Sequence, residues 1–290
     1  MEIVVFGAGS LGSLIGGLLA REHPVTLVGR DPHVRAITAA GLTVTGAFDF
    51  EVTPDARTTV PAKTDLVIVT VKAYDTPSAA AALTGCDCDA ILSLQNGMGN
   101  EGTLAETLEA DVLAGTASYG ALQDKPGRVV CTGRGDVVIG PPDGGSSSLA
   151  DRIREAFEKS GIETIAATDM PRRLWEKLAV NAGINATTAL ARIRNGVLAE
   201  TPAGTIARRA ARETARTAQD EGVELTEERA VTALERVIDA TASNQSSMYR
   251  DVRAGRRTEV DAINGYVADQ GTDTPVNDTL AALLRTVESQ

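Results

Sequence analysis

The chain begins with residues 1–30, MEIVVFGAGSLGSLIGGLLAREHPVTLVGR, and this stretch decides the fold. Its first letters, EIVVF, form a β-branched run that predicts a strand buried on both faces. Gly7, Gly9 and Gly12 follow in the spacing G-x-G-x-x-G, an apolar helical segment comes next, and VTLV predicts a second strand. In this arrangement the first glycine permits a sharp turn, the second lets a pyrophosphate approach the backbone, and the third lets the helix pack closely on the sheet.

This context turns a common glycine pattern into a prediction of a dinucleotide-binding turn. The helix start presents free backbone N–H groups and the positive end of the helix dipole, both of which attract phosphate. A tight turn that binds nothing is the alternative explanation of the same pattern. The residues expected to contact the cofactor here are Gly7, Ala8, Gly9, Ser10, Leu11 and Gly12.

Arg30, at the end of the second predicted strand, bears on which dinucleotide binds. A carboxylate at this place accepts hydrogen bonds from the ribose 2′-OH of NAD, whereas an arginine pairs with the 2′-phosphate of NADP. Asp31 follows directly, so the signal is mixed. We expect NADP(H) as the cofactor.

Length and composition exclude several classes of protein. The 290 residues suggest two domains, and with 43% hydrophobic but only 3% aromatic residues the cores must be built from Ala, Val, Leu and Ile. A net charge of −11 excludes nucleic-acid binding by general attraction, and this acidic balance resembles that of proteins from a high-salt cytoplasm. Because no apolar run approaches the ~20 residues of a membrane span and no signal-peptide pattern is present, we expect a cytoplasmic protein without a membrane partner.

The cysteines and histidines form no recognisable site. Cys86, Cys88 and Cys131 do not make a disulfide framework, and the Cys-Asp-Cys run lacks the second pair or the histidines that a metal site requires. We therefore expect no metal. His23 and His33 have no patterned partner and are expected at the surface.

The chain changes character near residue 168. Before it, strands and helices alternate. Strands are expected at 2–6, 25–28, 64–70, 90–94, 111–119 and 161–166, a strand or hairpin at 42–52, two strands around a turn at 128–139, and helices at 32–40 and 149–160. After it, nearly everything predicts helix, at 171–188, 201–221, 227–241, 246–255, 258–270 and 277–288. We expect an α/β domain with a doubly wound parallel sheet over residues 1–168 and an all-helical domain over residues 169–290.

Three polar residues lie just past the carboxyl ends of predicted strands, namely Arg30, Lys72 and Asn96. Ligands of open α/β sheets bind outside these ends. The three side chains are therefore expected to converge on one crevice, which the helical domain would close.

A polar stripe marks the helix expected at 171–188. Lys177, Asn181 and Asn185 are spaced i, i+4 and i+8, so they share one face. A solvated surface is the simpler explanation. Asparagine is, however, a poor helix former, and the other helices of this chain carry mainly Glu, Arg and Ala, so the stripe favours a face that binds a polar ligand.

Two further polar positions have an ordinary explanation when taken alone. Glu259, with Thr258 as a cap, predicts a first-turn glutamate favoured by the helix dipole. Ser246 and Ser247 suit a helix N-cap. Nothing local marks any of them as catalytic.

Taken together, the motifs resemble the ketopantoate reductase (2-dehydropantoate 2-reductase) family over nearly the whole chain. They are GAGSLG (7–12), TVKAYDT (70–76), QNGMGN (95–100), KLAVNAGIN (177–185), RNG (194–196) and SSMYRDVRAGRRTEVDAINGY (246–266). The first is shared by many dehydrogenases, but the lysine–asparagine helix and the last run are far more specific. The resemblance implies a Rossmann-type first domain and reduction of 2-dehydropantoate to (R)-pantoate by NADPH, a step toward pantothenate and coenzyme A.

The resemblance also implies roles for individual residues. Lys177 matches the family's catalytic lysine, which protonates the carbonyl oxygen, and Glu259 matches the carboxylate that binds the substrate hydroxyl. An ammonium group suits this chemistry because it stabilises a developing alkoxide and supplies the proton. The matches to substrate-binding asparagines are Asn181, Asn185 and Asn195, and Ser247 matches a serine that holds the substrate carboxylate. The matches to residues near the dinucleotide are Lys72 and Asn96.

Two other functions share these features. A relative that reduces another branched 2-keto acid would keep the motifs, although a site built to bond the hydroxyl of ketopantoate should reject 2-ketoisovalerate. A regulatory protein that senses NADP(H) without turnover would have no use for Lys177 and Glu259. The expected partner is a small 2-keto acid, and the helical faces of the second domain could support a homodimer.

Overall fold

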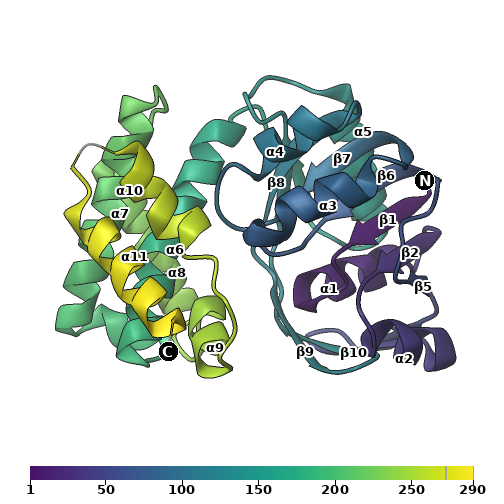
Figure 1. Cartoon of the computed structure of the whole chain (residues 1–290), viewed down its shortest axis with the longest axis horizontal. Coiled ribbons are helices and arrows are strands. Elements are labelled where there is room, and N and C mark those ends of the chain that lie inside the picture. The colour runs from purple at the N-terminus through teal and green to yellow at the C-terminus, as the bar shows by residue number, and fades with distance from the viewer. Residues whose placement is uncertain (272, 290) are drawn as a thin grey trace. The chain divides into compact units, whose positions relative to one another are not determined.

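The computed structural model describes residues 1–271 and 273–289. Its contacts divide the chain into two compact units, and each is described by itself (Figure 1). The first unit comprises residues 1–95 and 99–170, and the second comprises residues 96–98 and those from Pro171 onward. The chain thus passes to the helical unit two residues beyond the expected position 168, and one short segment of the α/β part, residues 96–98, makes its contacts with the helices.

The first unit is built on an eight-stranded sheet with the order β12-β11-β8-β7-β6-β1-β2-β5. Its strands are β1 (Ile3–Phe6), β2 (Val25–Val28), β5 (Asp55–Arg57), β6 (Lys63–Val69), β7 (Asp87–Ser93), β8 (Asp111–Ala117), β11 (Val137–Gly140) and β12 (Thr164–Ala166). The strands from β5 to β8 in this order are all parallel, whereas β11 runs antiparallel to β8 and parallel to β12. The doubly wound sheet predicted from the sequence is confirmed, with an antiparallel pair added at one edge.

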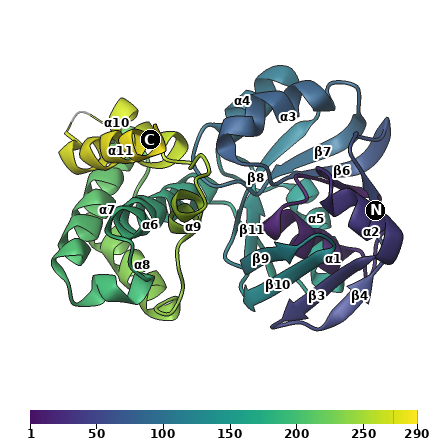
Figure 2. The ribbon, with the colours of Figure 1, turned by 60° about the horizontal axis from the view of Figure 1, so that its bottom comes forward.

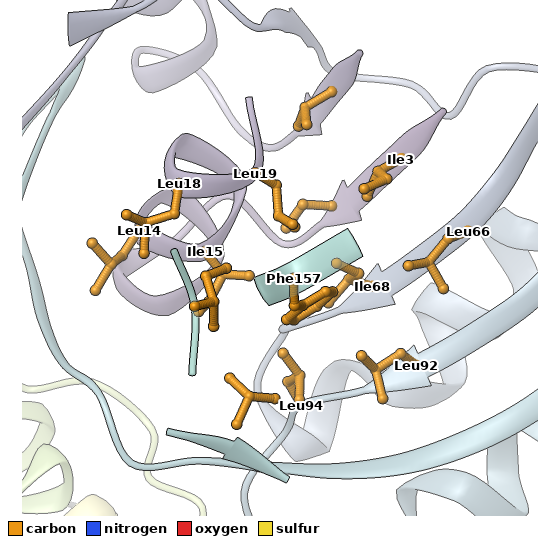
Figure 3. Packing of buried hydrophobic residues seen from close by; sticks show 14 of the residues in the cluster. Ile3, Leu14, Ile15, Leu18, Leu19, Leu66, Ile68, Leu92, Leu94 and Phe157 are labelled. Carbon is orange, nitrogen blue, oxygen red and sulfur yellow. The ribbon is translucent and has the colours of Figure 1, made fainter. Parts of the chain in front are cut away.

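Alternate residues of the central strands supply a hydrophobic core to each face of this sheet. Ile3 and Val5 of β1 pack with α1 (Ser10–Leu19) and α5 (Ser148–Lys159), as Figure 3 shows for Ile3 and its neighbours around Phe157. Val4 packs instead with α3 (Thr76–Leu83) and α4 (Asn100–Thr107). Because successive side chains of a strand point to opposite faces, an unbroken apolar run fills both layers, as a parallel sheet requires.

A second sheet explains why α1 is apolar on every side. This sheet has the order β4-β3-β10-β9, formed by β4 (Phe50–Val52), β3 (Leu42–Gly46), β10 (Arg128–Gly133) and β9 (Gly120–Lys125) (Figure 2). A Cβ atom on Gly16 would lie 2.4 Å from Leu27 of the large sheet, and one on Gly17 would lie 3.0 Å from Leu42 of the small sheet. The helix is therefore held between two sheets, and a helix buried all round must be hydrophobic all round.

The two strands expected within residues 128–139 form, but they do not pair with each other. β10 pairs with β3 and β9 in the small sheet, and β11 pairs with β8 and β12 in the large one. Gly135 carries the chain between the sheets so close to Ser118 that a Cβ there would lie 2.3 Å from Ser118 Oγ. Of these partners only β9 is a near neighbour in the sequence, so local patterning does not reveal which sheet each strand joins.

His33 is buried, with 4% of its surface exposed, and its expected surface position is wrong. Its Nδ1 accepts the N–H of Gly127 at 3.0 Å, and its Nε2 lies 2.9 Å from Ser13 Oγ. Since a neutral imidazole has one N–H, Nε2 carries the proton and donates it to Ser13. Burial lowers the pKa of His33. The ring thereby ties the start of α2 (His33–Ala40) to α1 and to the turn before β10.

The second unit surrounds one central helix, α6 (Met170–Ala191) (Figures 1 and 2). The elements around it are the 3₁₀ turn η2 (Asn195–Ala199), α7 (Pro202–Asp220), α8 (Glu227–Ala240), α9 (Ser247–Arg253), the π-helical turn η3 (Asp261–Gly265), α10 (Tyr266–Gln270) and α11 (Pro275–Glu288). Every residue from 178 to 189 is buried except Asn181, which is half-buried. Small residues permit this packing, since a Cβ on Gly183 would lie 2.7 Å from the carbonyl oxygen of Ala207 in α7.

A buried carboxylate fixes the last helix of the second unit. Glu213 of α7 accepts the backbone N–H groups of Val276 (3.0 Å) and Asn277 (2.9 Å) and also the side-chain Nδ2 of Asn277 (2.9 Å). A negative charge is favourable at a helix N-terminus, and the three charge-assisted hydrogen bonds offset the cost of burying it.

Of the helices in residues 1–271 and 273–289, none combines the length and apolar character needed to cross a bilayer.

Candidate active site

The three glycines of the first turn differ in what surrounds them. Gly7 has φ +112°, a conformation that favours glycine, and a Cβ on it would lie 2.7 Å from the backbone nitrogen of Val71. A Cβ on Gly12 would lie 2.3 Å from the carbonyl oxygen of Gly7. A Cβ on Gly9 would meet no protein atom closer than that same oxygen, at 3.9 Å. Packing therefore requires Gly7 and Gly12, whereas Gly9 leaves open space at the start of α1.

This space suits a phosphate group. No side chain caps the N-terminus of α1, whose N-cap residue is Gly9 itself. The hydroxyl of Ser10 accepts the N–H of Gln123 at 3.0 Å, which ties the turn to β9. Uncapped N–H groups beside an open Cβ position form an anion site, because the helix dipole adds to their attraction. The residues of the turn thus fit the pyrophosphate of a dinucleotide.

Asp31, the carboxylate next to Arg30 that would favour NAD over NADP, forms an ion pair with another residue. Its Oδ2 lies 3.2 Å from Nε of Arg35, one helical turn away. Arg30 is exposed just past β2, and within residues 1–271 and 273–289 its guanidinium makes no hydrogen bond or ion pair. The exposed Asp31–Arg35 pair adds little stability, but it holds the carboxylate toward Arg35 and leaves Arg30 accessible to a ligand.

The loops after β6 and β7 rest on a buried glutamine that the sequence analysis missed. Gln95 is 6% exposed, and its Nε2 donates to the carbonyl oxygen of the residue before Lys72 (3.2 Å) and to Thr76 Oγ1 (2.7 Å). Thr76 Oγ1 in turn donates to Asn100 Oδ1 at 2.8 Å. The sequence signal that points to Gln95 is its position, as a polar residue directly after a buried strand and directly before Asn96. These bonds fix the backbone on either side of both predicted cofactor residues.

Residues 96–98 have their contacts in the second unit. The N–H of Met98 donates to the carbonyl oxygen of Ala262 at 3.1 Å. Gly97 has φ +82°, and a Cβ on it would lie 2.6 Å from Cβ of Ala262. This close approach places the segment that contains Asn96 against the η3 turn.

Glu259 lies directly before this turn and is 5% exposed. Thr258 Oγ1 accepts the N–H of Val260 at 3.2 Å, as a capping residue does. The helix that follows is a π turn, however, in which the N–H of Gly265 donates to the carbonyl oxygen of Val260 at 2.9 Å. The expected α-helical register is therefore wrong. Glu259 is a buried carboxylate beside a π turn, a feature that is frequent at functional sites.

The polar stripe of α6 lies on one face, because the helix is continuous over its whole length. Lys177 and Asn181 are half-buried, and Asn185 is 6% exposed. The stripe is therefore more shielded than a fully solvated helix face, most of all at Asn185. A partly buried row of one ammonium and two amides can bind an oxygen-rich molecule through several hydrogen bonds at once.

Asn195 is held by the segment that leads to α9. Its backbone N–H donates to the carbonyl oxygen of Asn244 at 3.0 Å, and its Nδ2 donates to Thr241 Oγ1 at 2.8 Å. The side chain is 6% exposed, and its Oδ1 has no partner among the described residues. Asn195 thus fixes the path of residues 241–246.

The serines that follow join α9 to α6. Ser246 caps α9 by accepting the N–H of Tyr249 at 3.1 Å, and its hydroxyl lies 2.8 Å from Thr188 Oγ1. Thr188 Oγ1 also donates to the carbonyl oxygen of Asn185 at 3.2 Å. Ser247, the first residue of α9, is half-buried. The second unit therefore brings Ser247 close to the Asn185 end of the stripe.

The predicted site residues are divided between the units. The first unit contains the glycine turn, Arg30 and Lys72, and the second contains Asn96, Lys177, Asn181, Asn185, Asn195, Ser247 and Glu259.

The cysteines lie apart from these residues. Cys86, Cys88 and Cys131 are all free, and burial raises the pKa of the Cys88 thiol to about 11. A cavity of about 590 Å³ beside Cys86 and Cys88 is lined by residues 83–88 and 107–110, at the amino ends of β7 and β8 and so at the sheet edge opposite the glycine turn. Within the described part of the chain, no three His, Cys, Asp or Glu side chains are grouped so as to hold a metal ion.

The sheet and its glycine turn define the class of protein: a dinucleotide-binding protein of Rossmann type. Comparison with known families is more specific. The family model described as ketopantoate reductase PanE/ApbA matches residues 3–144, and the model of its C-terminal domain matches residues 169–288. The chain belongs to the ketopantoate reductase family.

Relatives and solved structures agree with this assignment. The 2-dehydropantoate 2-reductase of Halobacterium salinarum is 43% identical over 305 residues, which cover 98% of each chain, and that of Archaeoglobus fulgidus is 38% identical over 298 residues, covering 99% of this chain and 98% of the relative. A PanE/ApbA family ketopantoate reductase from Ralstonia eutropha has a TM-score of 0.91 at 32% identity, covering 100% and 99% of the two chains. A ternary structure of D-mandelate dehydrogenase with NADH and anilino(oxo)acetate has a TM-score of 0.93 at 25% identity, covering 100% and 98%.

Proposed function

We propose that the protein is an NADPH-dependent 2-dehydropantoate 2-reductase, which forms (R)-pantoate for pantothenate and coenzyme A synthesis. The observation that carries this proposal is the stripe of Lys177, Asn181 and Asn185 on the central helix of the second unit, half-buried at Lys177 and Asn181 and buried at Asn185. A partly buried ammonium followed by two amides suits reduction of a small, oxygen-rich keto acid. The activity named for the Halobacterium and Archaeoglobus relatives supports the choice of substrate.

The cofactor residues would act through the first turn and the strand ends. A bound nicotinamide dinucleotide supplies the hydride. The N–H groups at the start of α1 would hold its pyrophosphate beside Gly9, and Arg30 would pair with a 2′-phosphate. The engagement of Asp31 by Arg35 supports NADP over NAD. Lys72 and Asn96 would complete the contacts to the dinucleotide.

The second unit would bind the keto acid and manage the proton. Lys177 would donate its proton to the carbonyl oxygen while its charge stabilises the negative charge that develops there. Glu259 would accept a hydrogen bond from the substrate hydroxyl. Asn181, Asn185 and Ser247 would bind the remaining oxygen atoms. Asn195, whose Nδ2 is engaged by Thr241, would act on the substrate by fixing the segment before Ser247.

The test of this function is NADPH oxidation by the purified protein in the presence of 2-dehydropantoate, followed by absorbance. Lys177→Ala is expected to lower kcat by roughly 10²- to 10⁴-fold, the usual effect of losing a general acid. Lys159→Ala, which removes an exposed lysine at the end of α5, is the matched control and should behave as wild type. Protein that binds NADPH but reduces no 2-keto acid would instead be a sensor, and equal activity on 2-ketoisovalerate would mean a different keto acid is the substrate.

The cofactor preference is tested separately at Arg30. Arg30→Ala is expected to raise the KM for NADPH by roughly 10- to 100-fold, because hydrogen bonds to charged groups contribute ~1.5–3 kcal/mol. The KM for NADH should not change, since NADH has no 2′-phosphate. An unchanged KM for NADPH would disprove the role of Arg30.

We also propose that the protein assembles as a homodimer through its helical unit. Val197 and Ile206 of this unit are exposed apolar side chains, at 42% and 43%. Light scattering should then give about twice the chain mass of 30.2 kDa; a single-chain mass at micromolar concentration would contradict this.

A further inference from the structure

Helix α9 contains an arginine whose charge is not matched by the protein. Arg250 is half-buried in the middle of this helix. In the chain as described, residues 1–271 and 273–289, no hydrogen bond or ion pair involves its guanidinium. Its neighbour Asp251 is paired with Arg256, whose Nε and Nη2 lie 3.0 and 2.8 Å from Asp251 Oδ1. The nearest carboxylate in sequence is therefore engaged by a different arginine.

The surroundings of Arg250 disfavour its positive charge. Burial lowers the pKa of this guanidinium; the carboxylate of Asp251 opposes that effect, and the charge of Arg256 adds to it. An arginine stays protonated in proteins, so the charge is present and its desolvation is not fully compensated. Proteins keep such unfavourable arrangements mainly at functional sites, where a ligand supplies the missing partner. The missing partner of a half-buried guanidinium is an anion.

The helical spacing places this cation beside the proposed substrate residues. Ser247 and Arg250 are three residues apart and so are neighbours on the surface of α9. Met248 and Asp251 are buried and mark the inner face, whereas Arg253 is exposed. Ser247 therefore lies at the border of the inner face, and Arg250 lies one helical turn further along and further round the helix, away from that face.

The same end of α9 is anchored to α6. Ser246, next to Ser247, lies 2.8 Å from Thr188 Oγ1, and Thr188 is bonded to the backbone of Asn185. Ser247 thus lies near the buried end of the polar stripe, with Arg250 as its i+3 neighbour on α9. Both elements belong to the second unit.

We infer that Arg250 joins Ser247, which the resemblance to the family assigns to the substrate carboxylate, in binding that group of the 2-keto acid, and that Arg250 is the residue that selects for an acid. This inference rests on the proposed function. A guanidinium can donate two parallel hydrogen bonds to a carboxylate, and the serine hydroxyl adds a third donor. Because the carboxylate is unchanged during reduction of the keto group, Arg250 binds ground state and transition state equally, so its loss raises KM and leaves kcat nearly unchanged.

The experiment compares Arg250→Gln with Arg253→Gln, which removes an exposed arginine from the same helix. We expect Arg250→Gln to raise the KM for 2-dehydropantoate roughly 10- to 100-fold, the range for losing charge-assisted hydrogen bonds. The KM for NADPH and kcat should stay within about twofold of wild type. Arg250→Lys should recover part of the affinity, because it restores the charge without the paired donors. Arg253→Gln should match wild type.

Two further readouts separate carboxylate binding from a structural role. Ketopantoyl lactone has the same carbon skeleton as 2-dehydropantoate but no carboxylate. The ratio of kcat/KM for the acid to kcat/KM for the lactone should therefore be lower in Arg250→Gln than in wild type, by the same factor by which the KM for the acid rises. The melting temperature of Arg250→Gln should be unchanged or higher, since the substitution removes an uncompensated charge.

Several results would overturn the inference. A rise in the KM for NADPH instead of that for the keto acid would assign Arg250 to a phosphate of the cofactor. Equal effects of the Arg250 and Arg253 substitutions, an unchanged acid-over-lactone preference, or a lower melting temperature would assign it to the fold. If the wild type does not reduce 2-dehydropantoate, the proposed function itself fails; if the wild type is active and Arg250→Gln is indistinguishable from it, only the present inference fails.

Discussion

Replacing Gly9 with alanine tests whether the first turn binds a dinucleotide or only shapes the fold. The structure predicts that this substitution leaves stability nearly unchanged. The new Cβ would meet no protein atom closer than 3.9 Å, and the backbone angles of Gly9, φ −87° and ψ −154°, are open to alanine. Alanine is a poorer N-cap than glycine, but it also restricts the unfolded chain more. These opposed effects leave a net change below about 1 kcal/mol, or roughly 2–4 °C in melting temperature.

Cofactor binding should respond much more strongly. The added methyl group occupies the open space at the helix start, where the pyrophosphate is proposed to approach the backbone. Losing a hydrogen bond between an N–H group and a charged phosphate costs ~1.5–3 kcal/mol. We therefore expect Gly9→Ala to raise the Kd for NADPH by roughly 10- to 150-fold.

Gly12→Ala is the matched control, because it adds the same methyl group where the protein is already close-packed. Its Cβ would lie 2.3 Å from the carbonyl oxygen of Gly7 and 2.4 Å from Thr70 Oγ1. Overpacking of this kind costs ~1–3 kcal/mol, so the melting temperature should fall by roughly 2–12 °C. Titration of NADPH by fluorescence together with thermal unfolding measures both effects. Wild-type NADPH affinity in Gly9→Ala would refute the assignment of this space to a phosphate, and a loss of stability equal to that of Gly12→Ala would show that Gly9 serves packing.

Three further substitutions test particular side chains. Wild-type stability should fall as the pH drops below about 6.5, because His33 is neutral when folded and its lowered pKa makes the unfolded state bind the proton first. In His33→Asn the free energy of unfolding should depend less steeply on pH, by up to ~1.4 kcal/mol per pH unit, which corresponds to one proton. Urea unfolding of both proteins over a pH series measures this difference, and identical pH curves would contradict the assignment. Gln95→Leu should cost ~1–3 kcal/mol by leaving the Thr76 network incomplete, whereas Gln270→Leu, which changes an exposed glutamine at the end of α10, should be neutral by the same measurement. Glu213→Leu should cost ~3 kcal/mol or more, since it leaves the N–H groups at the start of α11 unpaired, and a loss below ~1 kcal/mol would disprove that role.

Features that depend on neighbouring residues could be predicted from the sequence. The β-branched runs and glycine spacing of residues 1–30 predict strand, turn, helix and strand, and the structure has β1, α1 and β2 there. The i, i+4, i+8 spacing of the polar stripe predicts one helix face, and α6 is continuous across it. In both cases the repeat of the backbone, two residues for a strand and 3.6 for a helix, is contained in the local order of side chains.

The roles of the site residues came from the resemblance rather than from local chemistry. Glu259 alone resembles any first-turn glutamate, and Ser247 resembles any cap. Their match to a family predicts what they do, but the particular position of Glu259 beside a π turn depends on a hydrogen bond between Val260 and Gly265 that no α-helical pattern contains.

The sequence by itself determined that an α/β domain precedes a helical one, the doubly wound class, the glycine turn between β1 and α1, and the face of α6 that carries Lys177. Tertiary structure alone decided that His33 is buried, that β10 and β11 join different sheets, and that Gln95 braces the loops at the strand ends. The physical reason is separation along the chain. The N–H that His33 accepts comes from a residue 94 positions away, Gln95 donates to a residue 19 positions earlier, and β10 and β11 pair with the non-adjacent strands β3 and β8.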